Sequence, residues 1–298
     1  MWGLPIACYL FFGGLSAGLF IVGAIIQLAH GARFSTATCR CSSFSLIFLV
    51  AGGMLLLFDV SLPERALRFA SAFQNVASSW MARGAWALCF AGTIFALYSA
   101  IASMPFKHAK ALKRRRQTLL NIIGIVGILC ALFLAGYTGM LLVNASGIPL
   151  WNTSVLIALF VISSLDTGVA FALFPFMGMR KPGFIEQITL RRLEIGFVAL
   201  LAVEIVLLVL YLLFANQCWS TYGFATALGS FDTIVFGRFV QTIVLLLLAV
   251  GLDIVTFCQD RFAKLLRCSV SCAAIVTGLS LRIAVLSLQF HIPALFMV

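Results

Sequence analysis

The chain has 298 residues, of which 63% are hydrophobic and 10% charged, and its formal net charge is +11. This composition excludes a water-soluble globular protein and indicates a polytopic membrane protein. The basic excess does not indicate nucleic-acid binding, because the lysines and arginines gather in connections between apolar segments, where anionic lipid head groups lie. We therefore expect membrane lipids, and no nucleic acid, among its partners.

Eight apolar runs are each long enough to cross the hydrocarbon core of a bilayer. They fall at about 4–29, 42–58, 84–104, 119–145, 153–179, 193–215, 239–258 and 269–290. In lipid, only helices and closed barrels satisfy the backbone, and these runs are continuous rather than alternating. The sequence therefore predicts an all-α bundle of eight transmembrane helices, forming one integral membrane domain over residues 1–298. The first run lacks a charged leader, so we expect a membrane helix there rather than a cleaved signal.

The basic residues are distributed unevenly between the two sides of this bundle. Connections one, three, five and seven hold fifteen of the twenty Lys and Arg, whereas the opposite side holds Arg65, Arg68, Arg83 and Arg238. The positive-inside rule then predicts that both termini face outside. All five tryptophans map to that outer side: Trp2, Trp80, Trp86, Trp151 and Trp219.

The outer connections have an unusual character. Segment 62–76 has apolar residues on one helical face, and 216–237 reads as a long, nearly uncharged loop. This pattern favours an outer surface covered by a partner. The alternative is an interfacial helix that lies among the head groups without any partner.

Four ionisable residues lie within the predicted membrane helices: Asp166, Glu204, Asp253 and Arg282. At 1.5 Å per residue, Asp166 and Arg282 both lie roughly 20 Å from the starts of their runs, so we expect them to pair. Glu204 reaches nearly the same depth. We predict that these four residues form a proton pathway, with a purely structural cluster as the alternative.

Histidine and cysteine usage limits which cofactors the chain can hold. A cytochrome b with two haems needs about four intramembrane histidines, but His30, His108 and His291 lie at helix ends and no CxxCH occurs. The cysteines also lack the spacing of an iron–sulfur site. We expect no haem, cluster or metal site in this chain. Any redox chemistry would use a dissociable organic carrier, with further cofactors in another subunit.

The stretch 130–152 combines an apolar helix with a run of small residues. Gly136 and Gly139 flank Tyr137, and the stretch ends at Asn152 after a Gly-Pro turn. The glycines allow close approach to the backbone, and the tyrosine adds one hydroxyl to an apolar wall, which suits a quinone ring. The alternative is that the glycines pack helices and the tyrosine belongs to an aromatic belt.

Four motifs, in order, carry a resemblance to a known family. They are WGLPIACYLFFGGLSAG at 2–18, DVSLPER at 59–65, SWMARGAW at 79–86, and GYTG at 136–139 followed by PLWN at 149–152. Together with the eight-helix pattern they resemble the NrfD/PsrC family of polysulfide reductase-type membrane anchor subunits.

The resemblance implies a membrane anchor in the cytoplasmic (inner) membrane of a bacterium or archaeon, acting in anaerobic respiration. Such an anchor transfers electrons and protons between a quinone, expected to be menaquinone, and an iron–sulfur subunit with four clusters. A molybdopterin catalytic subunit completes the complex, and both partners dock on the outer face. The chemistry on the terminal substrate would then lie outside this chain.

The resemblance also implies where the quinone binds, between the start of the first helix and the end of the fourth. Tyr137 matches the ring-binding tyrosine of the family, whereas the asparagine and histidine of its best-known member correspond to Pro5 and Tyr9 here. The predicted quinone-binding residues are Tyr137, Tyr9, Gly136, Gly139, Asp59, Arg83 and Asn152.

Two other functional classes remain open at this stage. One is a secondary transporter or proton-pathway subunit without quinone chemistry, although the sequence lacks the paired, Gly/Pro-broken helices of inverted repeats. The other is a scaffold that only holds its partners at the membrane. A scaffold would differ from an anchor in showing no quinone-dependent turnover.

Overall fold

The structure is a computed structural model that describes residues 4–60, 80–103, 110–144, 149–177, 184–221, 231–258 and 263–288. Within these ranges the chain is helical, with no strand. The eight long helices are α1 (Leu4–His30), α2 (Ser35–Val60), α4 (Trp80–Ser103), α5 (Lys110–Val143), α6 (Ser154–Met177), α7 (Phe184–Thr221), α8 (Phe231–Cys258) and α9 (Ala263–Ser287). Two short 3₁₀ turns, η1 (Gly31–Phe34) and η2 (Pro149–Trp151), precede α2 and α6. The predicted all-α, eight-helix architecture is confirmed.

Several helices extend beyond the apolar runs that predicted them. The helix α5 begins at Lys110 and α7 at Phe184, so basic and polar residues continue the helices past the hydrocarbon core. The predicted loop 216–237 is also helical at both ends, because α7 continues to Thr221 and α8 begins at Phe231. Helical hydrogen bonds do not depend on apolar side chains, which is why hydropathy alone underestimates these lengths. The predicted segment 62–76 lies outside the described residues.

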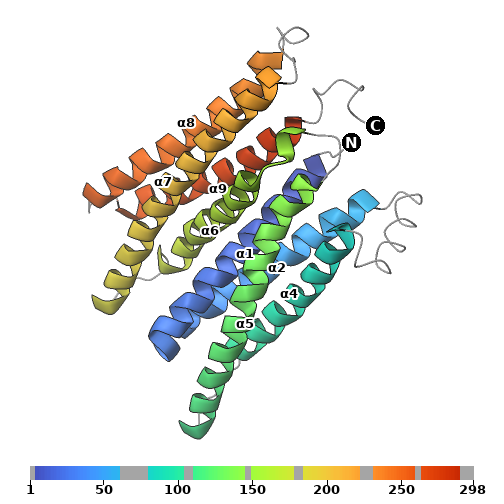
Figure 1. Ribbon diagram of the computed structural model, residues 1–298. Helices are drawn as coiled ribbons and strands as arrows, with labels where there is room; N and C mark the ends of the chain where they lie inside the picture. Colours follow the sequence, from blue (N-terminus) through green and yellow to red (C-terminus); the bar gives the residue numbers. More distant parts are fainter. Residues whose placement is uncertain are drawn as a thin grey trace.

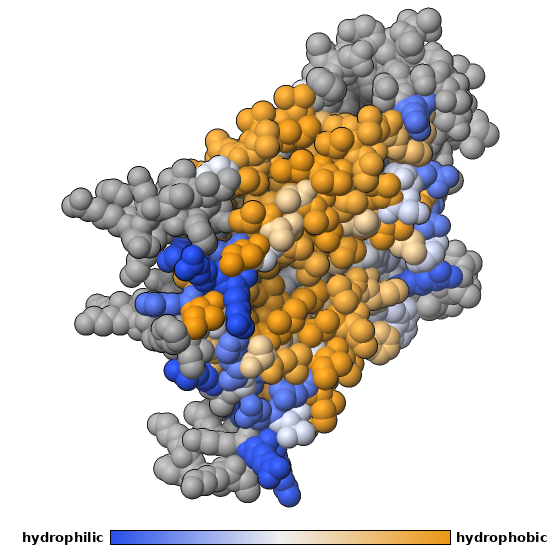
Figure 2. Space-filling model, turned by 60° about the vertical axis from the view of Figure 1, so that its left-hand side comes forward, coloured by the Kyte–Doolittle hydropathy of each residue, from blue (hydrophilic) through white to orange (hydrophobic). Residues whose placement is uncertain are grey.

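The described helices form a multi-pass membrane protein. Seven of them contain an apolar stretch long enough to cross a bilayer, and α8 has a shorter one, Gly237–Leu252, in its described part. Figure 2 shows a broad apolar band, with hydrophilic residues gathered toward its edges. The long hydrophobic side chains exposed on this band are those expected of a lipid-facing surface.

Successive helices run in alternating directions, so the bundle has two distinct ends (Figure 1). We call the end where α1, α4, α6 and α8 begin the tyrosine end, and the opposite end the arginine end. Arg83 and Arg238 lie at the tyrosine end. The arginine end carries Arg33, Arg40, Arg114, Arg115, Arg116, Arg191, Arg192 and Arg267. The start of α1 and the end of α9 share the tyrosine end, and that this end faces outside remains a prediction.

The central helix of the bundle is α1, which packs against α2, α5, α6 and α9. In the apolar stretch of α1 that could cross the membrane, 89% of the residues are buried inside the bundle. Gly18 of α1 crosses Gly168 of α6 so closely that a Cβ atom on either glycine would overlap the other helix's backbone. On the α2 side, the Ser16 hydroxyl donates to the Ser45 carbonyl and the Ser45 hydroxyl to the Ser16 carbonyl, each at 2.8 Å. The side chains on α1 are thereby held in fixed positions relative to their neighbours.

Candidate functional site

Two buried tyrosines meet near the tyrosine end. Tyr9 lies near the start of α1 and Tyr137 near the end of α5, and their side chains are 4% and 3% exposed. The two hydroxyls lie close enough to interact with one another. The Tyr137 ring packs directly against the backbone of Gly84, near the start of α4. A Cβ atom at position 84 would overlap the ring and its hydroxyl. We call Tyr9 and Tyr137 the tyrosine pair.

The glycines beside Tyr137 have different surroundings. A Cβ atom on Gly139 would lie 2.7 Å from the Ile157 Cα of α6, so this glycine allows α5 and α6 to approach closely. A Cβ atom on Gly136 would make an ordinary contact with Val161, at 3.8 Å. Gly139 therefore has the helix-packing environment that the sequence left open as an alternative, and nothing in the geometry requires glycine at position 136.

Three further residues predicted to bind quinone lie at the same end of the bundle as the tyrosine pair. Arg83, beside Gly84 in α4, has its guanidinium carbon 4.5 Å from the centroid of the Trp80 ring. Asn152 is exposed between η2 and α6. Asp59 lies in the last turn of α2, but its side chain is outside the described part. The structure thus brings together Tyr9 and Tyr137 with Gly84, which the sequence had not singled out.

A second buried group joins α6 to α7. Asp166 and Glu204 are 1% and 0% exposed, and their carboxyl groups lie close enough to interact with one another. A carboxylate has only acceptor oxygens, so a hydrogen bond between the two carboxyls would require a proton on one of them. Within the described residues neither Glu204 carboxyl oxygen has a hydrogen-bond donor, whereas Asp166 accepts from the Thr167 backbone N–H. We call Asp166 and Glu204 the carboxyl pair.

Arg282 of α9 lies beside the carboxyl pair and is fully buried. Its guanidinium donates to the Ser163 hydroxyl at 3.2 Å, the Ser164 hydroxyl at 3.2 Å, the Gly278 carbonyl at 2.7 Å and the Leu10 carbonyl at 3.3 Å. It also lies over the rings of Phe11 and Phe160, at 5.5 and 5.3 Å. These contacts tie α9 to α1 and α6.

This arrangement differs from the direct Asp166–Arg282 pair expected from the sequence. Arg282 interacts electrostatically with both carboxyls, but in the described chain its hydrogen bonds go to hydroxyl and carbonyl groups instead. The carboxyls interact with each other. The side chain of Asp253, the fourth residue of the predicted proton pathway, lies outside the described part.

The sequence did not predict the hydroxyl and carbonyl groups that accept hydrogen bonds from Arg282. Gly14 makes room for the guanidinium, since a Cβ atom there would lie 2.6 Å from its Nη2 atom. Gly14 and Gly18 have the small-residue spacing that marks close helix contacts, so this signal was present in the sequence. Trp151 lies at the tyrosine end, the side to which the sequence maps it, but it is buried in the bundle. It is 1% exposed, and its indole N–H donates to the Val285 carbonyl at 3.0 Å.

Comparison with known proteins identifies the family. The family model described as "Polysulphide reductase, NrfD" matches residues 1–293. The chain belongs to the NrfD polysulphide reductase family. A curated relative, the C subunit of the polysulfide reductase from Wolinella succinogenes, is 31% identical to it over 180 residues. That match covers 57% of this chain and 56% of the relative, so the chain spans little more than half the length of the relative it matches.

Family membership agrees with the resemblance drawn from the four sequence motifs. It also identifies this NrfD-family chain as a multi-pass membrane subunit. Among the described residues, no group of three or more His, Cys, Asp or Glu side chains could hold a metal ion.

Proposed function

We propose that this chain is the quinone-reactive membrane anchor of a respiratory oxidoreductase complex. It exchanges electrons and protons between a quinone and an iron–sulfur partner subunit. Family membership supports the class of protein, and the tyrosine pair is the observation that carries the proposal. Its two residues come from the start of α1 and the end of α5, the helix ends between which the family resemblance implies that the quinone binds.

The chemistry of the tyrosine pair suits a quinone. Two phenols carry two O–H groups, and a hydrogen bond between Tyr9 and Tyr137 uses one of them. The described residues use only that bond, which leaves the other O–H for a quinone carbonyl oxygen. Gly84 fixes the Tyr137 ring against α4, so this donor is held in place rather than free to rotate away. A bound quinone would supply the two-electron chemistry, and the tyrosine pair would orient its ring.

The partners follow from the same proposal. A four-cluster iron–sulfur subunit and a molybdopterin catalytic subunit would dock at the tyrosine end, on the outer face of a bacterial or archaeal cytoplasmic membrane. Menaquinone is the expected quinone. Two features support this orientation: the arginines of the described helices gather at the opposite end, and basic connections stay on the cytoplasmic side.

A second candidate function rests on the carboxyl pair. Two carboxyls that share a proton inside a membrane bundle are suited to accept and release protons, as in proton relays. Under this alternative the chain would be a proton-pathway subunit without quinone chemistry of its own. Loss of quinol-driven turnover on altering the tyrosine pair distinguishes the two candidates, because only the anchor needs that pair.

The test is Tyr137→Phe, assayed in the complex with quinol and with an artificial electron donor. The variant removes the Tyr9–Tyr137 bond, so quinol-driven turnover should fall several-fold, in line with about 1 kcal/mol for one hydrogen bond. Activity with the artificial donor should be unchanged. Tyr98→Phe is the matched control, because Tyr98 is equally buried but lies on α4 near the arginine end. Equal quinol kinetics in both variants would contradict the assignment.

A further inference from the structure

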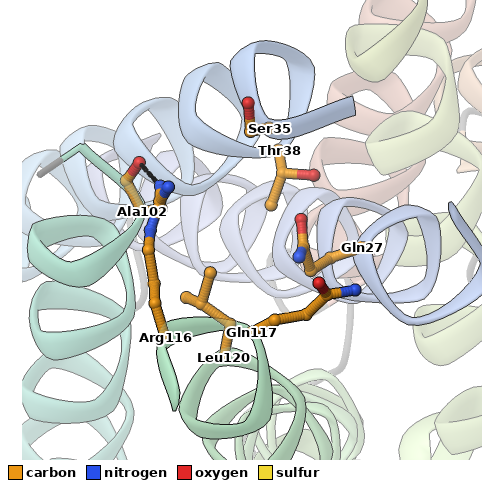
Figure 3. Close-up of a pocket in the computed structure, with 7 residues that line it drawn as sticks. All are labelled: Gln27, Ser35, Thr38, Ala102, Arg116, Gln117 and Leu120. Carbon is orange, nitrogen blue, oxygen red and sulfur yellow. Dashed lines mark hydrogen bonds between the residues drawn. The ribbon is translucent and has the colours of Figure 1, made fainter. Parts of the chain in front are cut away.

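A cavity lined by both polar and apolar groups lies at the arginine end, between α1, α2, α4 and α5. Its volume is about 200 Å³. One water molecule needs roughly 10–15 Å³, so this space holds considerably more than a single water. The lining residues are Gln27, Ser35, Thr38, Ala102, Arg116, Gln117 and Leu120 (Figure 3). We call this space the arginine-end cavity.

Two of the lining side chains are buried without a hydrogen-bond partner. Gln27 and Thr38 are 2% and 1% exposed, and within the described part of the chain neither the Gln27 Oε1 nor the Thr38 Oγ1 atom has a partner. Figure 3 shows both side chains at the space between the helices. An unmade buried hydrogen bond costs about 1–3 kcal/mol, so native proteins fill such positions with a ligand or ordered water.

Arg116 supplies the charge of the arginine-end cavity. Its Nε atom donates to the Ile101 carbonyl at 3.0 Å, and Nη2 donates to the Ala102 carbonyl, which together cap the end of α4. A guanidinium has five N–H donors, so these two bonds leave others available. They also hold the planar group in one orientation at the cavity wall. Such a fixed fork is the geometry that suits a phosphate or carboxylate.

Gln117 is positioned by the turn between α1 and α2. Gly31 of η1 has a positive φ of 60°. The Gln117 amide lies so close to Gly31 that a Cβ atom there would overlap it. This contact sets a second amide at the cavity, beside Gln27. The wall therefore presents hydroxyl, amide and guanidinium groups from three helices, α1, α2 and α5.

The balance of groups in the cavity indicates the ligand. The lining residues within the described part of the chain include one cation, Arg116, and no acid, so an anion is favoured. Gln27 Oε1 is an acceptor, so the ligand must also offer a hydroxyl or amine hydrogen. The cavity lies at the basic end of the helices, where lipid phosphates are found. Basic pockets between membrane helices bind anionic lipid head groups at this depth.

We propose that the arginine-end cavity binds the phosphate-bearing head group of an anionic membrane phospholipid. Arg116 holds the phosphate oxygens, and Gln27 and Thr38 hold the hydroxyls of a glycerol head group, as in phosphatidylglycerol. Bound there, the lipid joins α1, α2 and α5 at the end of the bundle opposite the tyrosine pair. The site is independent of the quinone chemistry.

The test is lipid binding to the purified protein in detergent, followed by native mass spectrometry. Phosphatidylglycerol, phosphatidylcholine and inorganic phosphate are titrated separately. Arg116→Gln should weaken phosphatidylglycerol binding about tenfold, since it removes a charge-assisted contact. Thr38→Val, which keeps the side-chain shape and leaves the α4 cap intact, should weaken it about threefold. Phosphatidylcholine, with the same phosphate but no glycerol hydroxyls, should bind more weakly than phosphatidylglycerol.

Arg115→Gln is the matched control. Arg115 is the neighbour of Arg116 and carries the same charge, but it is exposed and lies outside the cavity lining. It should leave phosphatidylglycerol binding unchanged. Equal weakening by Arg115→Gln and Arg116→Gln would mean that general surface charge holds the lipid, and would overturn the proposal. So would equal binding of phosphatidylcholine, or occupation of the cavity by inorganic phosphate while phosphatidylglycerol is excluded.

Discussion

The tyrosine pair and the buried charges around Arg282 lie in the same half of the bundle, but the fold depends on them differently. The Tyr9 and Tyr137 hydroxyls are neutral and interact with one another, so removing one of them loses at most a single neutral hydrogen bond. Arg282 donates to groups on α1, α6 and α9. Altering the charged group leaves charge stranded in low dielectric, whereas altering the tyrosine pair does not. We therefore expect the fold to tolerate changes at the tyrosine pair better than changes at Arg282, where the helices are joined.

The two regions touch through α1. Arg282 donates to the carbonyl of Leu10, the residue that follows Tyr9. A change at Arg282 therefore acts on the backbone of the residue next to Tyr9. This contact connects the proposed quinone site with the carboxyl pair, and it allows each region to be altered while the other is monitored.

The largest effect is expected for Arg282→Gln. The variant removes the guanidinium beside Asp166 and Glu204 and several hydrogen bonds between helices, at a cost of about 3–5 kcal/mol. The amount of folded protein recovered from size-exclusion chromatography, and its thermal midpoint, should both fall sharply. Arg40→Gln is the control, because Arg40 is exposed at the arginine end. Equal recovery of the two variants would show that Arg282 does not hold the bundle together.

A smaller loss is expected for Gly84→Ala, which tests how firmly the tyrosine pair is held. The added methyl group overlaps the Tyr137 ring, so the ring or α4 must move, at about 1–3 kcal/mol. Quinol-driven turnover should fall with stability. Gly92→Ala on the same helix provides the control, since its nearest neighbour outside α4 is Leu49 Cδ2 at 3.4 Å. If the two variants behaved alike, the close packing of Tyr137 against α4 would be refuted.

The next change separates the two roles of the carboxyl pair. Glu204→Gln keeps a donor for Asp166, because the amide N–H can replace a shared proton, and should shift the free energy of unfolding by about 1 kcal/mol or less. Glu204→Leu removes every donor and should cost more. Thermal unfolding of both variants measures the difference. Equal destabilisation would mean that the Asp166–Glu204 bond does not matter for stability, and a Gln variant with normal turnover would exclude a proton-transfer role for Glu204.

The smallest effect is expected at the arginine end, for Arg267→Ala. Arg267 and Glu194 form a salt bridge whose side chains are 23% and 10% exposed. Partly solvated pairs of this kind contribute about 1 kcal/mol or less, and salt screens them. Chemical denaturation should therefore show a small loss that shrinks at high ionic strength. A loss as large as that of Arg282→Gln would contradict the distinction between buried and peripheral charge.

The sequence predicted the helices well because hydropathy over a bilayer thickness is a strong signal. It also identified Asp166, Glu204 and Arg282, since an ionisable residue inside an apolar run is conspicuous. It did not predict which of them pair, because depth along a helix says nothing about rotation around the helix axis. Ser163 and Ser164 accept from Arg282, yet serines are common on membrane helices and gave no specific signal.

The contacts of the tyrosine pair could not be predicted from the sequence either. The family resemblance drew attention to Tyr137 and Tyr9, but from separate helices whose mutual orientation was unknown. Gly84 became part of the site only when α4 was seen against the Tyr137 ring. The partners of a side chain depend on which helices are neighbours, and that information lies in tertiary packing rather than in any single segment.

The central claim is that quinone binds at the tyrosine pair, and photolabelling with an azidoquinone tests it most directly. The purified protein is illuminated with the probe and digested, and the labelled peptides are identified by mass spectrometry. Label should appear on the first part of α1 around Tyr9 and the last part of α5 around Tyr137, and it should drop in a Tyr9→Phe, Tyr137→Phe double variant but not in Tyr98→Phe. Label concentrated instead around Gln27 and Arg116, at the arginine end, would contradict the account.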